Sequence, residues 1–132
     1  MDLNYTPEQE AFRADVRQFL DDNLPDDIRE RVQKRLRHSK DMTQRWQKIL
    51  HEKGWGASTW PEEFGGTGWS PIEQIIFEEE CALAGAPRQL DFGLRMVAPV
   101  IMTFGNDEQK KRFLPGILSG EDWWCQGYSE PG

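Results

Sequence analysis

Two short segments of the sequence each combine three signals for the start of an α-helix. Thr6-Pro7-Glu8-Gln9 and Ser70-Pro71-Ile72-Glu73 place a hydroxyl side chain at the N-cap, proline at the first helical position and Gln or Glu three residues after the cap. The cap hydroxyl accepts a hydrogen bond from a free backbone N–H, and the Gln or Glu side chain accepts one from the N–H of the cap residue. Proline costs nothing at the first position because its missing N–H would have no partner there. These segments predict a chain built from helices with defined starting points.

Apolar residues recur at helical spacing along six stretches of the chain, and caps or stops bound them. We expect helices from the Thr6 cap to Asn23, from Asp26 through Leu36, from near Asp41 to Lys53, from the Ser70 cap to Gly85, from about Phe92 to Phe104, and from the Asn106 cap to Ser119. Pro99 predicts a kink in the fifth helix and Pro115 a break in the sixth, because proline removes a helical hydrogen bond. The expected fold is all-α, a six-helix up-down type bundle.

The segment Trp55–Pro71 is rich in glycine and tryptophan. Glycines permit positive φ and close backbone approach, and large rings anchor turns by burial, so we expect an ordered loop and not a linker. The run Gly65-Gly66-Thr67-Gly68 lacks the spacing of either phosphate-binding glycine fingerprint and follows no predicted strand. Turn formation is the favoured interpretation of these glycines.

The charge of the chain argues against nucleic acid as a partner. Lys and Arg number 16 against 23 Asp and Glu, and the resulting net charge of -7 would repel phosphates. The basic residues between Arg29 and Lys40 are interpreted as a solvated helix face. No apolar run approaches the roughly 20 residues that a membrane helix needs, and the N-terminus lacks the basic and apolar regions of a secretory signal. No membrane association and a cytoplasmic location are expected.

Residues of the types that perform catalysis or bind metals do not form a recognisable cluster in the sequence. Cys81 and Cys125 lie far apart without C-x-x-C spacing, which indicates neither a disulfide framework nor a zinc site. His38 and His51 have no second ligand at helical spacing, and both are expected at the surface. Adjacent carboxylates such as Glu78-Glu79-Glu80 are more often solvated than catalytic. These residues predict no catalytic group and no metal site.

The final segment, Asp122–Gly132, differs from the helical stretches before it. Its aromatic, Gln- and Ser-bearing run followed by Ser-Glu-Pro-Gly predicts a β-strand that enters a turn. A lone strand leaves backbone donors and acceptors unpaired, so this segment is expected to need further polypeptide, another chain or a ligand. We therefore expect a helical domain over residues 1–121 that ends in a C-terminal strand stub over residues 122–132, which the family resemblance below implies to be the start of a truncated middle β-domain.

Four motifs, in order and spacing across nearly the whole chain, carry a resemblance to a known family. They are W-P-E-E-F-G-G-T-G at Trp60–Gly68, G-A-P at Gly85–Pro87, the run Gly105–Glu121, and W-C-Q-G-Y-S-E-P-G at Trp124–Gly132. Together they resemble the N-terminal part of the FAD-dependent acyl-CoA dehydrogenases. The resemblance implies that the helices form the N-terminal helical domain of that family, and that the final motif forms the first strand and turn of its middle β-domain.

The resemblance also implies a partial flavin site. In the family, this strand passes beside the isoalloxazine ring of FAD. The positions that match the start of the flavin-contacting segment are Gln126, Gly127, Tyr128 and Ser129. The hydroxyl of Ser129 and nearby backbone groups are suited to hydrogen-bond the polar edge of the ring. FAD is therefore the expected cofactor, bound in a site that this chain holds only in part.

An acyl pocket is implied ahead of Pro99, with Phe92, Arg95 and Met96 as its candidate residues and an acyl-CoA as the substrate. An arginine there indicates either a polar acyl group or, the favoured interpretation, a surface residue. In the family, a glutamate of the C-terminal domain removes the α-proton while the β-hydrogen leaves as hydride to flavin N5. No position of this chain matches that glutamate, so no catalytic residue is named. The chain alone is expected to be inactive without the missing middle and C-terminal domains or a partner chain.

Two other functions remain open. The chain could be a non-catalytic helical subunit or interaction module that assembles with a separate flavin-bearing chain, since some relatives work as heteromers. It could also belong to an acyl-CoA oxidase, which uses dioxygen on the same fold. The resemblance implies a homo- or hetero-oligomer in either case.

Overall fold

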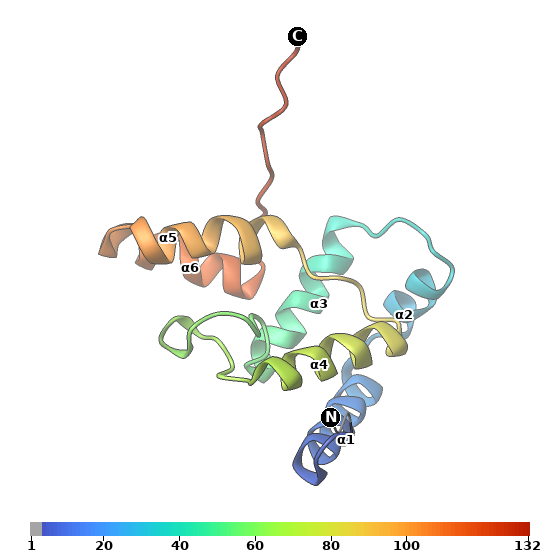
Figure 1. Ribbon diagram of the computed structural model, residues 1–132. Coiled ribbons are helices and arrows are strands. Elements are labelled where there is room, and N and C mark those ends of the chain that lie inside the picture. The colour runs from blue at the N-terminus through green and yellow to red at the C-terminus, as the bar shows by residue number, and fades with distance from the viewer. Residues whose placement is uncertain (1–3) are drawn as a thin grey trace. The chain divides into compact units, whose positions relative to one another are not determined.

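The computed structural model describes residues 4–132, which form α-helices joined by turns and loops (Figure 1). The α-helices are α1 (Pro7–Asn23), α2 (Asp26–Gln33), α3 (Lys40–Lys53), α4 (Pro71–Ala84), α5 (Ala98–Phe104) and α6 (Asp107–Ser119). A 3₁₀ turn, η1 (Glu62–Phe64), precedes α4, and a π-helix, η2 (Phe92–Val97), leads directly into α5. From residue 4 onward the chain forms no β-strand. The predicted all-α fold with six α-helices is confirmed.

Reciprocal capping defines three of the helix starts, as the sequence predicts. The N–H of Gln9 donates to Thr6 Oγ1 at 3.3 Å, and the N–H of Thr6 donates to Gln9 Oε1 at 2.9 Å. The same capping box forms at Ser70 for α4 and at Asn106 for α6. At the other end of α4, Gly85 adopts φ +79°, a left-handed conformation that glycine reaches without strain and that closes the helix.

The chain divides into two compact units. The first contains the residues up to Trp46 together with Gly68–Arg88, and the second contains Gln47–Thr67 together with Gln89–Gly132. In the first unit α1 packs against α4. Its most deeply buried apolar side chains are Val16, Leu20, Ile28, Trp46, Ile76 and Phe77.

The core of the second unit forms around Trp60. The buried residues of this core are Ala57, Trp60, Leu94, Ala98, Leu114 and Ile117. The indole Nε1 of Trp60 donates a buried hydrogen bond of 2.8 Å to the carbonyl of Leu94, which ties the glycine-rich loop to η2. A Cβ on Gly66 would lie 1.7 Å from the carbonyl oxygen of Trp60. Only glycine at position 66 therefore allows the backbone of the loop to approach itself this closely. The loop is ordered, as predicted.

Two helix boundaries differ from the prediction. The second helix ends at Gln33 and does not extend through Leu36, because Arg35 turns to φ +54° and Leu36 is left 48% exposed. The fifth predicted helix forms as η2 followed directly by α5, so Pro99 lies in the first turn of α5 within one continuous helical stretch. Proline cannot donate a helical hydrogen bond there, and the stretch changes from π- to α-helix at this point.

The predicted break at Pro115 is wrong. Helix α6 continues from Asp107 to Ser119 with Pro115 inside it. Proline removes one hydrogen bond, but Leu114 and Ile117 are buried on either side of it, and this packing holds both turns of the helix in line.

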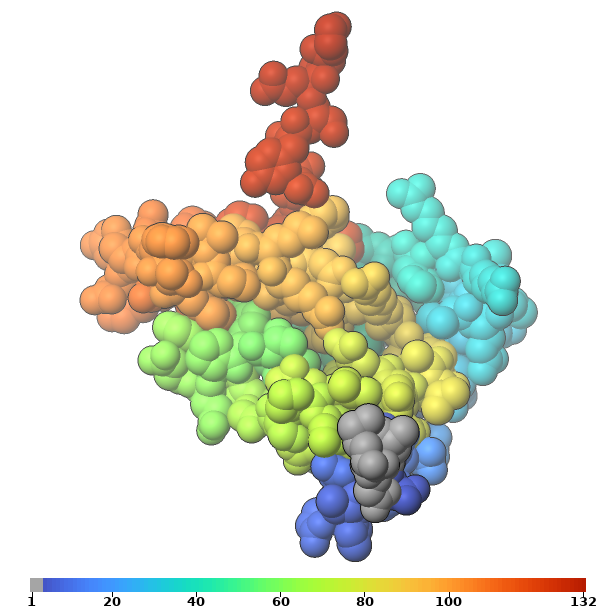
Figure 2. Space-filling model, in the orientation of Figure 1, coloured from blue at the N-terminus to red at the C-terminus, as the bar shows by residue number. Residues whose placement is uncertain are grey.

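The predicted C-terminal strand stub is also wrong for this chain. Residues 125–132 run as an exposed chain without regular structure that leaves the helices of the second unit (Figures 1 and 2). Strand structure requires hydrogen bonds to a neighbouring strand, and none of the residues from 4 to 132 supplies one. The segment therefore lacks the partner on which its predicted conformation depends.

Candidate functional site

A cavity of about 230 Å³ lies where η2 meets the start of the C-terminal segment. Its lining residues are Phe92, Met96, Val97, Trp124, Cys125, Gln126, Gly127 and Tyr128. Two sets of predicted residues thus come together: Phe92 and Met96 from the acyl pocket, and three of the four flavin positions. They are separated by about thirty positions in the sequence, so the turn between α5 and α6 brings them to one place.

The packing of Trp124 determines where the C-terminal segment leaves the helices. Its ring meets Phe113 of α6 edge-to-face, with ring centroids 5.7 Å apart and an interplanar angle of 76°. On its other side it lies close to η2, because a Cβ on Gly93 would come within 3.4 Å of Trp124 Cδ1 and 3.1 Å of Ile117 Cγ2. The indole therefore lies against the π-helix at ordinary contact distance, and the tighter neighbour of Gly93 is Ile117. This contact positions residues 125–128 along the cavity.

The remaining predicted residues do not line the cavity. Arg95 is exposed, and its Nε lies 3.5 Å from Oδ1 of Asp91 four positions earlier. This ion pair within one helical stretch agrees with the favoured interpretation of Arg95 as a surface residue. Ser129 is exposed beyond the end of the lining segment.

The groups at the cavity fit a planar molecule with a polar edge, such as a flavin ring. The indole Nε1 of Trp124 is buried and has no hydrogen-bond partner within residues 4–132. A buried donor without a partner costs about 1–3 kcal/mol, so this position favours an added acceptor. Gln126 and Tyr128 are exposed and offer amide and hydroxyl groups in the same lining as the apolar side chains of Phe92 and Met96.

None of the residues that line this cavity is a carboxylate, an imidazole or a lysine. The lining therefore supplies apolar contact and hydrogen bonds but no general base. Cys125 is an exposed free thiol at its edge. Trp124, Val97 and Cys125 were not among the predicted site residues; Trp124 and Cys125 stand inside the final motif, while no signal in the sequence marks Val97.

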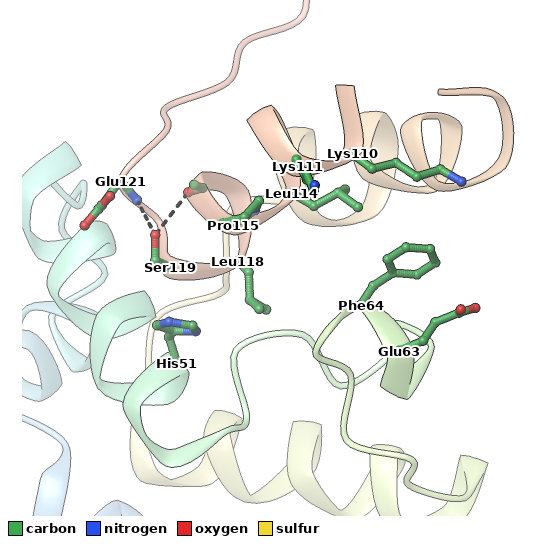
Figure 3. Close-up of a pocket in the computed structure, with 11 residues that line it drawn as sticks. His51, Glu63, Phe64, Lys110, Lys111, Leu114, Pro115, Leu118, Ser119 and Glu121 are labelled. Carbon is green, nitrogen blue, oxygen red and sulfur yellow. Dashed lines mark hydrogen bonds between the residues drawn. The ribbon is translucent and has the colours of Figure 1, made fainter. Parts of the chain in front are cut away.

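A larger cavity of about 570 Å³ lies elsewhere in the second unit, between α6 and η1 (Figure 3). Figure 3 shows Phe64 and Glu63 on the η1 side, Lys110 on α6 and His51 at the opposite end. In this view Leu118 lies between His51 and Phe64. None of the predicted cofactor or substrate residues lines it. The sequence predicted His51 at the surface, but the residue is half-buried in this cavity.

The polar groups at one end of this larger cavity already serve the fold. Ser119 Oγ donates to the carbonyl of Gly116, and the N–H of Glu121 donates to Ser119 Oγ, both at 3.4 Å (Figure 3). Its charged residues include both lysines and glutamates, so no single charge is presented to a ligand. The smaller cavity, where the predicted residues meet, is the better candidate site.

No helix between residues 4 and 132 has the length and apolar character needed to cross a membrane. Within the same part of the chain, His, Cys, Asp and Glu side chains do not gather in groups of three or more that could hold a metal ion.

The chain is similar to a known protein family and to individual known proteins. The family model described as "Acyl-CoA dehydrogenase, N-terminal domain" matches residues 6–121. Acyl-CoA dehydrogenase FadE26 of Mycobacterium tuberculosis is 37% identical over 100% of this chain, and acyl-CoA dehydrogenase IpdE1 of Mycolicibacterium smegmatis is 40% identical over 94% of it. The chain covers 33% of each of these relatives, about a third of their length.

Two solved structures are similar to the chain over its full length. A chain of the ChsE4–ChsE5 complex from Mycobacterium tuberculosis gives a TM-score of 0.78 at 39% identity, with 33% of that chain covered. A chain of a structure titled "Tcur3481-Tcur3483 steroid ACAD" gives a TM-score of 0.80 at 35% identity, with 34% covered. In both, the matched part amounts to about a third of the solved chain.

Proposed function

This chain belongs to the acyl-CoA dehydrogenase family, and we propose on that basis that it supplies the N-terminal part of an FAD-dependent enzyme that dehydrogenates an acyl-CoA thioester between Cα and Cβ. The observation that carries this proposal is the cavity of about 230 Å³, where Phe92 and Met96 lie beside Gln126, Gly127 and Tyr128. Residues assigned separately to substrate and cofactor form one continuous lining.

Within this proposal the residues have distinct roles. Phe92 and Met96 contact the apolar acyl group and exclude water from it. Gln126 and Tyr128 hydrogen-bond the polar edge of the flavin, and Gly127 leaves room for the ring because a Cβ there would meet nothing within 4 Å in the chain itself. FAD, when bound, supplies the acceptor for the hydride of the substrate.

Ser129 and Arg95 lie outside the lining of the cavity. Ser129 completes the flavin-facing segment through its hydroxyl, one position beyond the residues that line the cavity. Arg95 does not contact the acyl group, because its guanidinium is paired with Asp91. No base lines the cavity, and the proposal assigns removal of the proton at Cα to a group in a further part of the enzyme or in a partner chain. The boundary at residue 121 between the helical domain and the following domain is part of the same proposal, and the extent of the family match supports it.

The proposal is tested on the longer protein that contains this chain, purified under gentle conditions. We expect bound flavin with visible absorbance, and bleaching of that absorbance when an acyl-CoA is added without oxygen. Tyr128→Phe should lower the affinity for flavin, whereas Thr59→Ala, at an exposed position outside the cavity, should leave it unchanged. A protein that carries no flavin and does not regain it on addition of FAD would contradict the proposal.

A heteromeric assembly is a second candidate, and one observation favours it. Both similar structures carry titles that name a pair of proteins, ChsE4–ChsE5 and Tcur3481–Tcur3483. In this version a separate chain supplies the flavin and the base, and this chain supplies the helical side of the acyl pocket. Co-expression with candidate subunits, followed by measurement of the mass of the complex, separates the two versions: a single-chain enzyme forms only homo-oligomers.

Substrate and electron acceptor are tested in the same preparation. One of the similar structures is titled a steroid enzyme, so a steroid-derived acyl-CoA belongs in the substrate panel beside straight-chain thioesters. Production of hydrogen peroxide during turnover in air would identify an oxidase and not a dehydrogenase.

A further inference from the structure

A second groove adjoins the candidate site on the far side of Trp124. It has a volume of about 310 Å³ and lies between α5 and α6. Its walls are mainly apolar: Val100, Ile101 and Phe104 come from α5 and Phe113 from α6. Gln109 is the one polar side chain that lines it, and no charged side chain does. Such a groove accepts an apolar group and rejects a charged one.

Only two residues, Trp124 and Val97, line both the groove and the candidate site. Trp124 is held in this position by its edge-to-face contact with Phe113, and its ring lies beside Gly93 of η2. Val97 ends the π-helix immediately before α5. The two side chains therefore form a partition between the site and the groove.

We propose that this partition limits the size of the acyl group: Trp124, with Val97, closes the acyl site, and its removal lets the end of a longer acyl chain enter the α5–α6 groove. The proposal rests on the proposed dehydrogenase function and adds a specificity-determining residue to it. The occupant of the groove is the apolar end of the substrate, because only Trp124 and Val97 separate the groove from the acyl site and no charged side chain lines it. Trp124 acts here through its bulk and takes no part in the chemistry.

The test uses the flavin-loaded enzyme that contains this chain and a series of straight-chain acyl-CoA thioesters. Each additional buried CH₂ is worth about fourfold in binding. We compare kcat/KM for a long-chain thioester with kcat/KM for a short-chain thioester. Trp124→Ala should increase the ratio of these two values by about tenfold or more. Val97→Ala removes the part of the partition that η2 supplies and leaves the contact between Trp124 and Phe113 intact. It should give a smaller increase of the same ratio.

A filling substitution distinguishes this mechanism from a general loosening of the fold. Val100 lines the groove and not the site, and it is 54% exposed. Val100→Trp should leave the chain-length profile of the otherwise unchanged enzyme as it is, and should cancel the gain of Trp124→Ala when the two are combined. A purely structural effect of Trp124→Ala would not be reversed in this way.

The outcomes separate the inference from the proposed function. If the unchanged enzyme neither binds flavin nor reduces it with any acyl-CoA, the proposed function fails and the inference fails with it. The inference alone is overturned if the unchanged enzyme is active and both partition variants behave as it does. Such variants would have the same melting temperature as the unchanged enzyme, bind flavin and keep the same chain-length profile. If Trp124→Ala does not fold, the profile of Val97→Ala decides, since a Val to Ala change removes two methyl groups and leaves the aromatic packing in place.

Discussion

The guanidinium Nη1 of Arg13 lies 2.6 Å from Oε1 of Glu80, and both residues are buried, Arg13 at 9% and Glu80 at 3% relative exposure. Arg17 donates to the other oxygen of the same carboxylate, also at 2.6 Å. Burial alone would raise the pKa of Glu80, but the hydrogen bonds and charges of Arg17 and Arg13 outweigh it, and the pKa is lowered. This cluster joins α1 to α4 inside the first unit.

Removal of the Glu80 charge should destabilise the chain strongly. Glu80→Gln leaves the buried guanidinium of Arg13 without its main counter-charge, and breaking a buried pair from one side costs about 3–5 kcal/mol. Urea unfolding followed by circular dichroism measures the change in the free energy of unfolding.

The neighbouring residue supplies the control for that measurement. Glu79 also pairs with Arg13, at 3.1 Å, but its side chain is 48% exposed. Glu79→Gln should cost less than about 1 kcal/mol, as for other solvent-exposed ion pairs. Equal losses for the two variants would show that burial of the cluster does not determine its energy.

Acid should destabilise the first unit through the same carboxylate. The pKa of Glu80 is lower in the folded chain than the ordinary value of 4.5, so its stabilising effect is present in full above about pH 4.5 and is lost as the pH falls through the folded-state pKa. Unfolding curves of the unchanged chain should therefore move to lower urea concentration below that pH. The Glu80→Gln chain should show a weaker dependence, and a curve parallel to that of the unchanged chain would contradict this assignment.

Gly66→Ala should disrupt the loop around Trp60. The added Cβ would lie 1.7 Å from the Trp60 carbonyl oxygen, a backbone atom that cannot move aside without breaking the turn. We expect a loss of about 3 kcal/mol or more in the free energy of unfolding, because the clash displaces the core residue Trp60. Gly127→Ala is the matched control for stability, since nothing lies within 4 Å of its added Cβ. Similar melting temperatures for the two variants would show that the loop rearranges freely.

The two thiols should differ in reactivity. Burial raises the pKa of Cys81 to about 12, with a smaller contribution from Glu78 and Glu80, whereas Cys125 is exposed. Because the thiolate is the reactive form, a maleimide at neutral pH should label Cys125 first and reach Cys81 only when the chain unfolds. Mass spectrometry of the digested, labelled protein gives the order. Faster labelling of Cys81 than of Cys125 in the folded chain would contradict it.

Local signals in the sequence correctly predicted where α1, α4 and α6 start. The capping boxes at Thr6, Ser70 and Asn106 formed because the paired groups lie within three residues of each other, so no distant contact is needed. The same local rules failed at Pro115 and at the C-terminal segment. At Pro115, burial of Leu114 and Ile117 outweighs the lost hydrogen bond, and the predicted strand depends on a partner that lies outside the local sequence.

The candidate site was predicted only where a motif carried it. The flavin positions Gln126 to Ser129 and the pocket residues Phe92, Arg95 and Met96 were assigned through the family resemblance, and their roles stay predictions until tested. The partition residue Val97 gave no signal in the sequence. It gains its position because the π-helix ends there, and a π-helix has no periodic pattern that distinguishes it from an α-helix over six residues.

For this protein the sequence alone determined where helices begin, which faces of them are apolar, and to which family the ordered motifs point, because all of these depend on neighbours along the chain. Only the tertiary structure decided that Trp124 packs between Phe113 and Gly93, that Glu80 is buried between two arginines, and that η2 meets the C-terminal segment at one cavity. These relationships join residues that are far apart in sequence. They arise because packing and desolvation act on distances in space, which no local pattern encodes.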